Sequence, residues 1–547
     1  MRHWLFGATM FLILAAGAQA ADTDLWALAR DKAPTHRFST LFTAQDVRRH
    51  LSSEEGLREA IDWCKATGVT KVYIEAFRSN YTAEKDVLAR ARDRFRDEGF
   101  IAHGCVTTTN VFKPSTGWDV VDCYTNEGTQ KRIEEIFRYT AGLFDVIMID
   151  DFWFTDCECE DCVKARGDRS WSDYRNDLML RVSKERVLGP ARAVNPNVKI
   201  IIKYPEWYDR FHERGYDVRR ESDAFDITWI GTETRDPDNA RWGKKPQFGA
   251  SWLALWTRAF SRGKLGGGWF DPLGTTPRTY VEQARQTILG LCPESMLFCY
   301  GALRQQHGPE DIAALRRELP GLLELAAFVK DEAPRGVGSY KPVNSAPGED
   351  AWIFNFLGML GIPMTADVEF PAAAPSLVLT HHAAADPALG DALAKALEAK
   401  KPLLVTSNLR AQLPEEARAR LTAPTVRILD LASAGAQRTD YGVLSTVRAL
   451  MDKPRAELDA LRAPLLAPLG IEFSAPGRVS LHLFGDRKAV VENFSDEPVE
   501  VRLAARKAAR YEKVIVLPMD ADVTLTAEGG AAAIRLPARS LVALRMP

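Results

Sequence analysis

Two adjacent carboxylates stand at the end of an apolar run in the stretch "FDVIMIDDFWFTDCECEDC", residues 144–162. The run predicts a buried strand, and Asp150 and Asp151 come directly after it. A carboxylate in that position can move a proton or attack an electrophilic carbon. Three cysteines with C-x-C-x-x-C spacing follow: Cys157, Cys159 and Cys162. They suit a zinc site completed by a fourth ligand, or one disulfide with a spare thiol, or three reduced cysteines.

The strand at residues 144–152 is one of eight short apolar runs that alternate with amphipathic stretches between residues 35 and 330. The runs begin at residues 36, 70, 99, 144, 198, 225, 265 and 295. They are rich in β-branched residues, as strands buried on both faces require. Eight such units predict a (β/α)8 barrel, in the α/β class, over residues 21–330. A doubly wound open sheet is the alternative.

Charged and aromatic residues gather where these predicted strands end. The active site of a (β/α)8 barrel lies at the C-terminal ends of its strands, so we expect these side chains to face a polar substrate. Aromatic faces also stack on sugar rings, which favours carbohydrate. The predicted substrate contacts are Glu75, Arg78, Asp150, Trp153, Lys203, Tyr204, Trp207, Arg235 and Trp269.

The carboxylates among these strand ends suit glycoside hydrolysis, which needs two of them across the barrel mouth. Asp151 is the predicted first member of the pair. Glu233 in "WIGTETRDP" is the preferred second member, with Asp271 in "GGGWFDPLG" close behind. Asp150 can raise the pKa of its neighbour, or can itself be the reactive aspartate.

The strand and cysteines at residues 144–162 resemble the glycoside hydrolase family 42 β-galactosidases. The resemblance implies a barrel, an α/β trimerisation domain and a small β-domain, with Asp151 as the acid/base residue. It also implies a structural zinc ion held by four cysteines, with Cys123 as the fourth ligand and Cys105 less favoured. The fourth strand of that family ends in Asn-Glu, and its nucleophile is a Glu on strand seven, where this chain has Asp271. A nucleophilic Asp on strand four with an acid on strand six would instead resemble the α-galactosidase-like barrels.

Two further units are predicted after the barrel. Residues 331–465 alternate strand and helix, and resemble a flavodoxin-like or amidotransferase-like α/β domain. This part carries no G-x-G-x-x-G, so we interpret it as structural or as the site of homo-oligomer formation. Residues 466–547 consist of short alternating runs separated by turns, which predicts a small antiparallel β-sandwich.

The N-terminus predicts export. Residues 1–20 combine a basic start, a short apolar run and Ala18-Gln19-Ala20 before Ala21, which is typical of a cleaved signal peptide. We expect a periplasmic or secreted protein without a membrane anchor after cleavage. The formal charge of −2, with 71 basic and 73 acidic residues and no basic block, argues against nucleic acid as a partner.

Together these features predict an exported glycoside hydrolase that cleaves O-glycosidic bonds of an oligo- or polysaccharide, with β-galactosidase-like chemistry, a structural zinc ion and no organic cofactor. The first alternative is a barrel that binds carbohydrate without catalysis. The second is a metal-dependent amidohydrolase, but the nine histidines include no H-x-H, and the pair at His381 and His382 falls outside the barrel.

Overall fold

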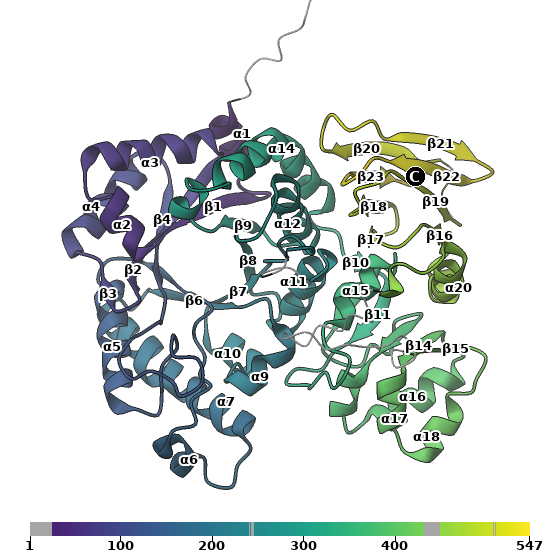
Figure 1. Ribbon diagram of the computed structural model, residues 1–547, viewed down its shortest axis with the longest axis horizontal. Helices are drawn as coiled ribbons and strands as arrows, with labels where there is room; N and C mark the ends of the chain where they lie inside the picture. Colours follow the sequence, from purple (N-terminus) through teal and green to yellow (C-terminus); the bar gives the residue numbers. More distant parts are fainter. Residues whose placement is uncertain are drawn as a thin grey trace, which may run out of the picture.

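The chain folds into a barrel followed by one parallel and two antiparallel sheets (Figure 1). The structure is a computed structural model that describes residues 24–239, 241, 245–430, 449–506, 508 and 510–546. The predicted signal peptide lies outside the described residues, as does a segment of the predicted α/β unit at 431–448. Among the described helices, none is both long and apolar enough to span a membrane.

The barrel is a closed ring of eight parallel strands, because the first strand pairs with both the second and the last. Its strands are β1 (Arg37–Phe42), β2 (Val69–Arg78), β4 (Ile101–Val106), β5 (Val146–Ile149), β6 (Lys199–Tyr204), β7 (Ile227–Gly231), β8 (Leu265–Phe270) and β9 (Glu294–Leu297). β3 (Tyr81–Thr82) pairs antiparallel with the end of β2. The predicted barrel is confirmed and the open sheet is wrong, since the β1–β2 pairing closes the ring.

Helices surround the barrel and cover the outer faces of its strands (Figure 1). The main ones are α2 (Ala44–His50), α3 (Glu54–Ala66), α4 (Lys85–Asp97), α5 (Glu127–Ala141), α7 (Trp171–Val182), α8 (Gly189–Val194), α10 (Val218–Ala224), α11 (Phe248–Phe260), α12 (Pro277–Leu289) and α14 (Gly308–Val329). The barrel interior is filled by side chains that include Tyr73, Met148, Ile201 and Trp229. A buried ion pair between Lys71 and Glu294, at 2.8 Å, lies at the N-terminal ends of β2 and β9. The packed interior leaves the opposite end of the barrel for the polar groups described below.

The part after the barrel contains a five-stranded parallel sheet in the order β12-β11-β13-β14-β15. These strands are β11 (Val337–Tyr340), β12 (Met364–Asp367), β13 (Leu377–Leu379), β14 (Leu403–Thr406) and β15 (Val426–Leu429), with helices α15 (Ile353–Met359), α16 (Leu389–Glu398), α17 (Ser407–Gln412) and α18 (Glu415–Arg420). Helix α11 of the barrel joins it through two indoles: Trp252 donates to Ser339 Oγ at 2.8 Å, and Trp256 to the Lys341 carbonyl at 2.9 Å. The flavodoxin-like or amidotransferase-like class of this unit stays a prediction.

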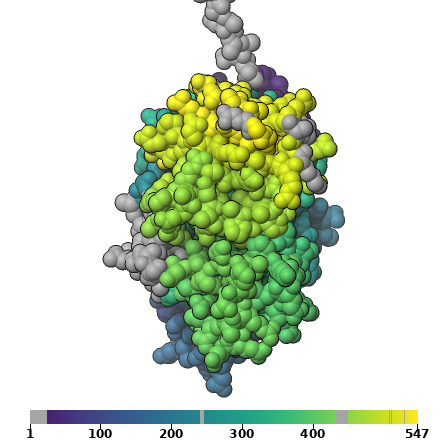
Figure 2. Space-filling view, turned by 90° about the vertical axis from the view of Figure 1, so that its right-hand side faces the viewer, coloured from purple at the N-terminus to yellow at the C-terminus, as the bar shows by residue number. Residues whose placement is uncertain are grey.

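The C-terminal part contains α20 (Arg455–Leu466) and two antiparallel sheets, in the orders β10-β17-β18-β23-β20 and β16-β19-β22-β21. The strands are β10 (Pro334–Arg335), β16 (Ile471–Ser474), β17 (Val479–Phe484), β18 (Lys488–Asn493), β19 (Val499–Ala505), β20 (Glu512–Leu517), β21 (Thr524–Glu528), β22 (Ala531–Leu536) and β23 (Leu541–Arg545). Figure 2 shows this part directly above the parallel-sheet part, on the same face of the molecule. The sandwich architecture and the boundaries at residues 330 and 465 stay predictions.

A buried arginine ties the barrel to the C-terminal sheets. Arg285 of α12 is 2% exposed and donates to Glu318 of α14 at 2.6 Å and to Glu492 of β18 at 3.2 Å. Glu492 has no exposed surface, and burial raises its pKa to about 8, against the lowering effect of Arg285; its ionised form therefore depends on this partner from another part of the chain.

We therefore expect Arg285→Ala to lower the free energy of unfolding by about 3–5 kcal/mol, because it leaves two buried carboxylates without their partner. Denaturant unfolding followed by fluorescence measures the loss. Arg94→Ala is the matched control: its ion pair with Glu98 is surface-exposed, and we expect a loss below about 1 kcal/mol. Equal losses in the two variants would contradict this role of Arg285.

Candidate active site

A buried ammonium group joins the ends of three barrel strands. Lys203, on β6, is 1% exposed, and its Nζ lies 2.6 Å from Asp151 Oδ2 and 3.2 Å from Glu233 Oε1. Nζ also lies 3.5 Å from Asp150 Oδ1 and 4.0 Å above the ring of Trp269 on β8. The predicted strand-end residues Asp150, Asp151, Lys203, Glu233 and Trp269 are therefore brought together.

The two adjacent aspartates have different surroundings. Asp150 is 2% exposed and accepts hydrogen bonds from Arg78 Nη2 at 2.8 Å, Thr107 Oγ1 at 3.1 Å and the Asp151 amide at 2.8 Å. Burial opposes its ionisation, but Lys203 and Arg78 hold the pKa of Asp150 below its usual range. The Asp151 side chain is 17% exposed and contacts Lys203, while Tyr216 fixes its backbone by donating to the Asp151 carbonyl at 2.6 Å. Of the two, Asp151 is the aspartate available to a ligand.

Glu75 and Arg78 form a support beneath Asp150. Glu75 is fully buried, and its Oε2 accepts from the Ala44 amide at 2.7 Å and from Arg78 Nε at 2.8 Å. This contact leaves Arg78 Nη2 directed at Asp150. Glu75 was predicted to contact substrate, which its complete burial contradicts. It positions Arg78 instead.

Asp271 is held in a separate ion pair. Its carboxylate accepts from Arg235 Nε at 3.0 Å and Nη2 at 2.8 Å, and from the Leu273 amide at 2.9 Å. A bidentate pair of this kind fixes both partners. The structure therefore brings Glu233, and not Asp271, into the group of carboxylates around Lys203.

Glu206 is a third carboxylate of the site that the sequence analysis missed. It follows β6 in the sequence "KYPEW", and one oxygen each of Asp151, Glu206 and Glu233 lie within 4.8 Å of one another. A Cβ at Gly231, the last residue of β7, would overlap the Glu233 carboxylate and approach the Glu206 amide, so glycine provides the room for this convergence. The signal for Glu206 was its position just beyond a strand end.

Glu206 depends on the part of the chain that follows the barrel. Its carboxylate pairs with Lys245 Nζ at 2.9 Å, and this ammonium lies 4.6 Å above the ring of Trp352. The Trp352 amide donates to Asp209 Oδ2 at 2.7 Å, and His382 Nε2 contacts Asp209 Oδ1 at 2.7 Å. The loop after β6 is therefore held at Glu206 by Lys245 and at Asp209 by Trp352 and His382.

The three converging carboxyl groups have different pKa values. Burial raises the pKa of Asp151 to about 7 and that of Glu233 to about 8, against the lowering effect of Lys203. Glu206 is opposite: burial opposes its ionisation, but Lys245 and Arg235 lower its pKa to about 2. Glu233 is 5% exposed, and its Oε2 has no hydrogen-bond partner among the described residues. The shorter contact of Lys203 with Asp151 places the negative charge there and the proton on Glu233.

Two of the predicted aromatic contacts are wrong. Trp153 and Tyr204 have no exposed surface. The indole of Trp153 donates to Ser183 Oγ at 2.9 Å, and Tyr204 packs against Tyr216 and Phe260, so both point away from the barrel mouth. Trp207 is partly buried beside Phe154, and its ring centroid lies 5.2 Å from that ring.

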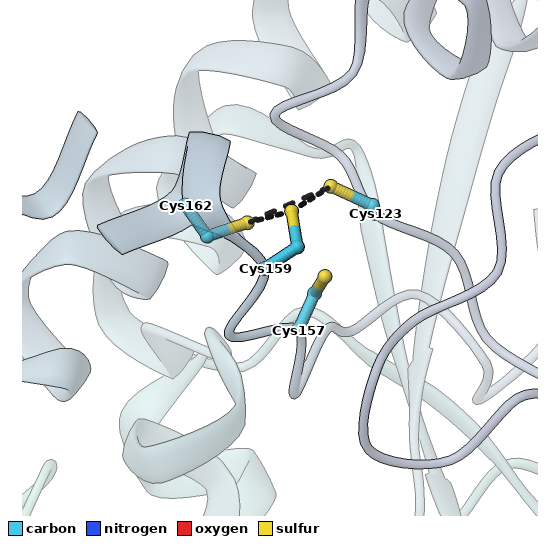
Figure 3. A group of neighbouring side chains, drawn as sticks. All are labelled: Cys123, Cys157, Cys159 and Cys162. Atoms are coloured by element: carbon cyan, nitrogen blue, oxygen red, sulfur yellow. Dashed lines mark hydrogen bonds between the residues drawn. The ribbon is translucent and has the colours of Figure 1, made fainter. Parts of the chain in front are cut away.

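The four cysteines named above converge from the loop before α5, the segment after β5 and the helix α6 (Glu160–Arg166) that follows it (Figure 3). Cys123 Sγ lies 3.7 Å from Cys159 Sγ and 3.5 Å from Cys162 Sγ, and the latter two are 3.7 Å apart. Cys157 Sγ lies within 4.8 Å of the others. A disulfide bond is only about 2.05 Å long, so these are separate thiol groups. Cys105 lies elsewhere, in the barrel interior beside Glu75.

The chain belongs to a family of glycosidases. Residues 23–316 match the family described as "Probable glycosyl hydrolase, catalytic domain", which is more than half of the chain. An uncharacterized protein of Saccharolobus solfataricus is 24% identical over 350 residues, which cover 57% of each chain. The present chain thus matches less than two thirds of that relative.

A solved glycoside hydrolase structure shares the fold of this chain. Alpha-L-fucosidase isoenzyme 2 from Paenibacillus thiaminolyticus superposes with a TM-score of 0.62 at 11% identity, covering 93% of this chain and 99% of that one. An exo-beta-1,4-mannosidase from Opitutaceae bacterium strain TAV5 gives a TM-score of 0.45 at 12% identity, covering 74% and 80%. At 11% identity, the likeness to the fucosidase concerns the fold alone.

Because Lys203 is the nearest cation to Asp151, we expect Lys203→Met to raise the pKa of Asp151 above about 7. Its ionised form would then appear only at higher pH. A carbon-13 NMR titration of labelled aspartate carboxyls measures the shift, with the resonance assigned by its loss in Asp151→Asn. Lys245→Met is the control: it should raise the pKa of Glu206 and change the pKa of Asp151 less than Lys203→Met does. An unchanged Asp151 titration in Lys203→Met would refute this account.

Proposed function

We propose that this protein is an exported, retaining glycoside hydrolase in which Asp151 is the nucleophile and Glu233 the general acid and base. The observation that carries the proposal is the Lys203 ammonium between these two side chains, whose carboxylate oxygens lie within 4.8 Å of each other. Retaining enzymes hold their carboxyl groups roughly 5–5.5 Å apart, whereas inverting enzymes need roughly 6.5–9.5 Å to admit a water molecule.

The first step of the proposed reaction forms a bond from an Asp151 carboxylate oxygen to the anomeric carbon. The glycosidic C–O bond breaks, its electron pair stays on the leaving oxygen, and Glu233 transfers its proton to that oxygen. Burial suits Glu233 to this task, because it raises the pKa to about 8 and keeps the carboxyl protonated at neutral pH. Lys203 suits Asp151 to attack, because its contact at 2.6 Å favours the ionised form.

The second step releases the sugar. Glu233, now a carboxylate, takes a proton from water, whose oxygen attacks the anomeric carbon and displaces Asp151. This restores both side chains to their starting states. Glu206 remains ionised throughout, and its charge adds to the effect of burial, which raises the pKa values of Asp151 and Glu233. Trp269, beneath Lys203, forms an apolar floor for the site.

The finer identity of the enzyme is part of the proposal. The family 42 resemblance, β-galactosidase-like specificity, export through a signal peptide at residues 1–20 and oligomer formation through residues 331–465 stay predictions. The charge distribution supports a carbohydrate partner, because paired carboxylates and cations occupy the barrel mouth. An Asp on the fourth barrel strand with a Glu on the sixth follows the α-galactosidase-like arrangement.

We expect the purified protein to hydrolyse at least one member of a panel of 4-nitrophenyl α- and β-glycosides and oligosaccharides, β-galactosides included. Asp151→Asn should lose activity on every substrate that the wild type cleaves. Glu233→Gln should lose about 10²–10⁴-fold on oligosaccharides and much less on 4-nitrophenyl glycosides, whose leaving group needs little protonation. Proton NMR of the first-formed sugar should show retention of configuration.

Asp271→Asn is the matched control, since Asp271 is paired with Arg235 outside the carboxylate group. The hydrolysis rate of Asp271→Asn should depend on the leaving group in the same way as that of the wild type. Wild-type hydrolysis by Asp151→Asn would remove the nucleophile assignment, and an inverted product would remove the retaining mechanism. Binding of oligosaccharides without hydrolysis by the wild type would favour the non-catalytic alternative.

We also propose that the four cysteines hold a structural zinc ion. Thiolates at about 2.3 Å from a tetrahedral zinc ion are separated by about 3.8 Å, close to the observed 3.5–3.7 Å. Neighbouring donors complete the fit: Thr125 Oγ1 lies 3.0 Å from Cys162 Sγ, and Lys113 Nζ lies 3.8 Å from Cys159 Sγ. A bound zinc ion would cross-link the two loops that supply the ligands.

Elemental analysis should find about one zinc ion per chain, and Cys159→Ser should lower the zinc content and the melting temperature. Cys292→Ser is the control, because this buried thiol lies outside the cluster and its loss should leave the zinc content unchanged. Absence of bound metal together with two disulfides among the four cysteines, found by mass spectrometry, would refute the zinc proposal.

A further inference from the structure

Trp118 presents an unusually exposed ring next to the site. It lies in the loop between β4 and α5, and 46% of its surface is exposed. This loop extends from the C-terminal end of a barrel strand, on the same side of the barrel as Asp151 and Glu233. Of the two exposed aromatic rings on this loop, Phe112 and Trp118, the ring of Trp118 is the one that contacts Phe152, the neighbour of Asp151 in the chain.

The ring of Trp118 packs on an aromatic cluster that includes Phe152, the residue directly after Asp151. Its centroid lies 5.5 Å from that of Phe152 and 6.1 Å from that of Phe154, with which it is stacked. The ring of Phe154 in turn contacts Trp207 at 5.2 Å. We call Trp118, Phe152, Phe154 and Trp207 the aromatic shelf. It connects the catalytic aspartate to an exposed indole.

The loop under Trp118 is fixed before any ligand arrives. The Asp156 carboxylate accepts from the Trp118 amide at 3.0 and 3.1 Å and also pairs with Arg214. Asp122 accepts from the amides of Val111 and Phe112, each at 2.8 Å. A ring on a backbone held in this way loses little conformational freedom when it binds, which favours ligand contact.

We propose that Trp118 is a stacking subsite for a second sugar ring of the substrate, beyond the ring whose bond is cleaved. The proposal rests on the glycosidase function above. A pyranose presents a face of C–H groups that packs on an indole, and the ring of Trp118 contacts that of Phe152, which directly follows Asp151 in the chain. Trp118 thus selects oligosaccharides over single sugars.

The test compares two kinds of substrate in the full-length protein. One is a glycosyl fluoride of the sugar that the enzyme cleaves, whose leaving group carries no ring; the other is the corresponding tri- or tetrasaccharide. Trp118→Ala should raise KM for the oligosaccharide about tenfold and change kcat/KM for the fluoride by less than about twofold. Trp118→Phe, which keeps a ring, should restore most of the oligosaccharide affinity.

Phe112→Ala is the matched control, because Phe112 lies on the same loop, is 64% exposed and is not part of the aromatic shelf. It should leave both substrates unaffected. Equal losses on both substrates in Trp118→Ala, or no loss on either, would overturn the subsite.

A binding measurement separates this subsite from the proposed function. Calorimetry with the Glu233→Gln variant and cello-, manno-, xylo- and maltotetraose and 2′-fucosyllactose reports affinity without turnover. Binding that weakens with Trp118→Ala would support the subsite even if the wild type hydrolyses nothing, and only the catalytic proposal would then fail. Absence of binding to every oligosaccharide, or an affinity that Trp118→Ala does not change, would overturn the subsite.

Discussion

The site depends on one buried ammonium group among three carboxylates. Removing an ion from water costs several kcal/mol, and Lys203 is stable in the barrel only because Asp150, Asp151 and Glu233 lie within 3.5 Å of it. The carboxylates in turn outnumber the ammonium. Arg78 neutralises the charge of Asp150, so Asp151 and Glu233 share the single positive charge of Lys203. A proton held between these two carboxyl groups therefore follows from the charge balance.

Among the described residues, the other carboxylates of the site are each paired with a cation, and Glu75 shares Arg78 with Asp150. Asp150 pairs with Arg78, Asp271 with Arg235 and Glu206 with Lys245. Lys203 and Arg78 lower the pKa of Asp150, and Lys245 and Arg235 lower that of Glu206, whereas Asp151 and Glu233 retain pKa values near neutrality. The Lys245 pair reaches beyond the barrel, since Trp352 lies against its ammonium. The part that follows the barrel thus contributes to the electrostatics of the site, which a purely assembly-related role would not require.

The barrel could be predicted because its strands are short apolar runs, several of them rich in Val and Ile. The strand ends could be predicted because polar residues follow the apolar runs directly. The error at Tyr204 arose from side-chain direction. Successive residues of a strand point to opposite faces, so Lys203 points into the barrel while Tyr204 points outward, and the sequence alone did not assign these directions. Glu206 lies in a loop, where no periodicity applies. Trp352 is over a hundred residues away from its partners, and only the folded chain brings it to Lys245.

The segment after β5 is held at both ends, and it connects the Asp151 carboxylate to the cysteine cluster. Lys203 holds Asp151 at its start, the cysteine cluster lies at its end, and Asp156 between them holds the Trp118 amide. Thr155 adds a bond from its amide to the Arg214 carbonyl at 3.0 Å. A displacement of the cysteines would therefore be carried along few residues to Phe152 and Asp151. The cysteine cluster, the proposed nucleophile Asp151 and the contact that holds the Trp118 amide therefore all lie on the same short stretch of chain.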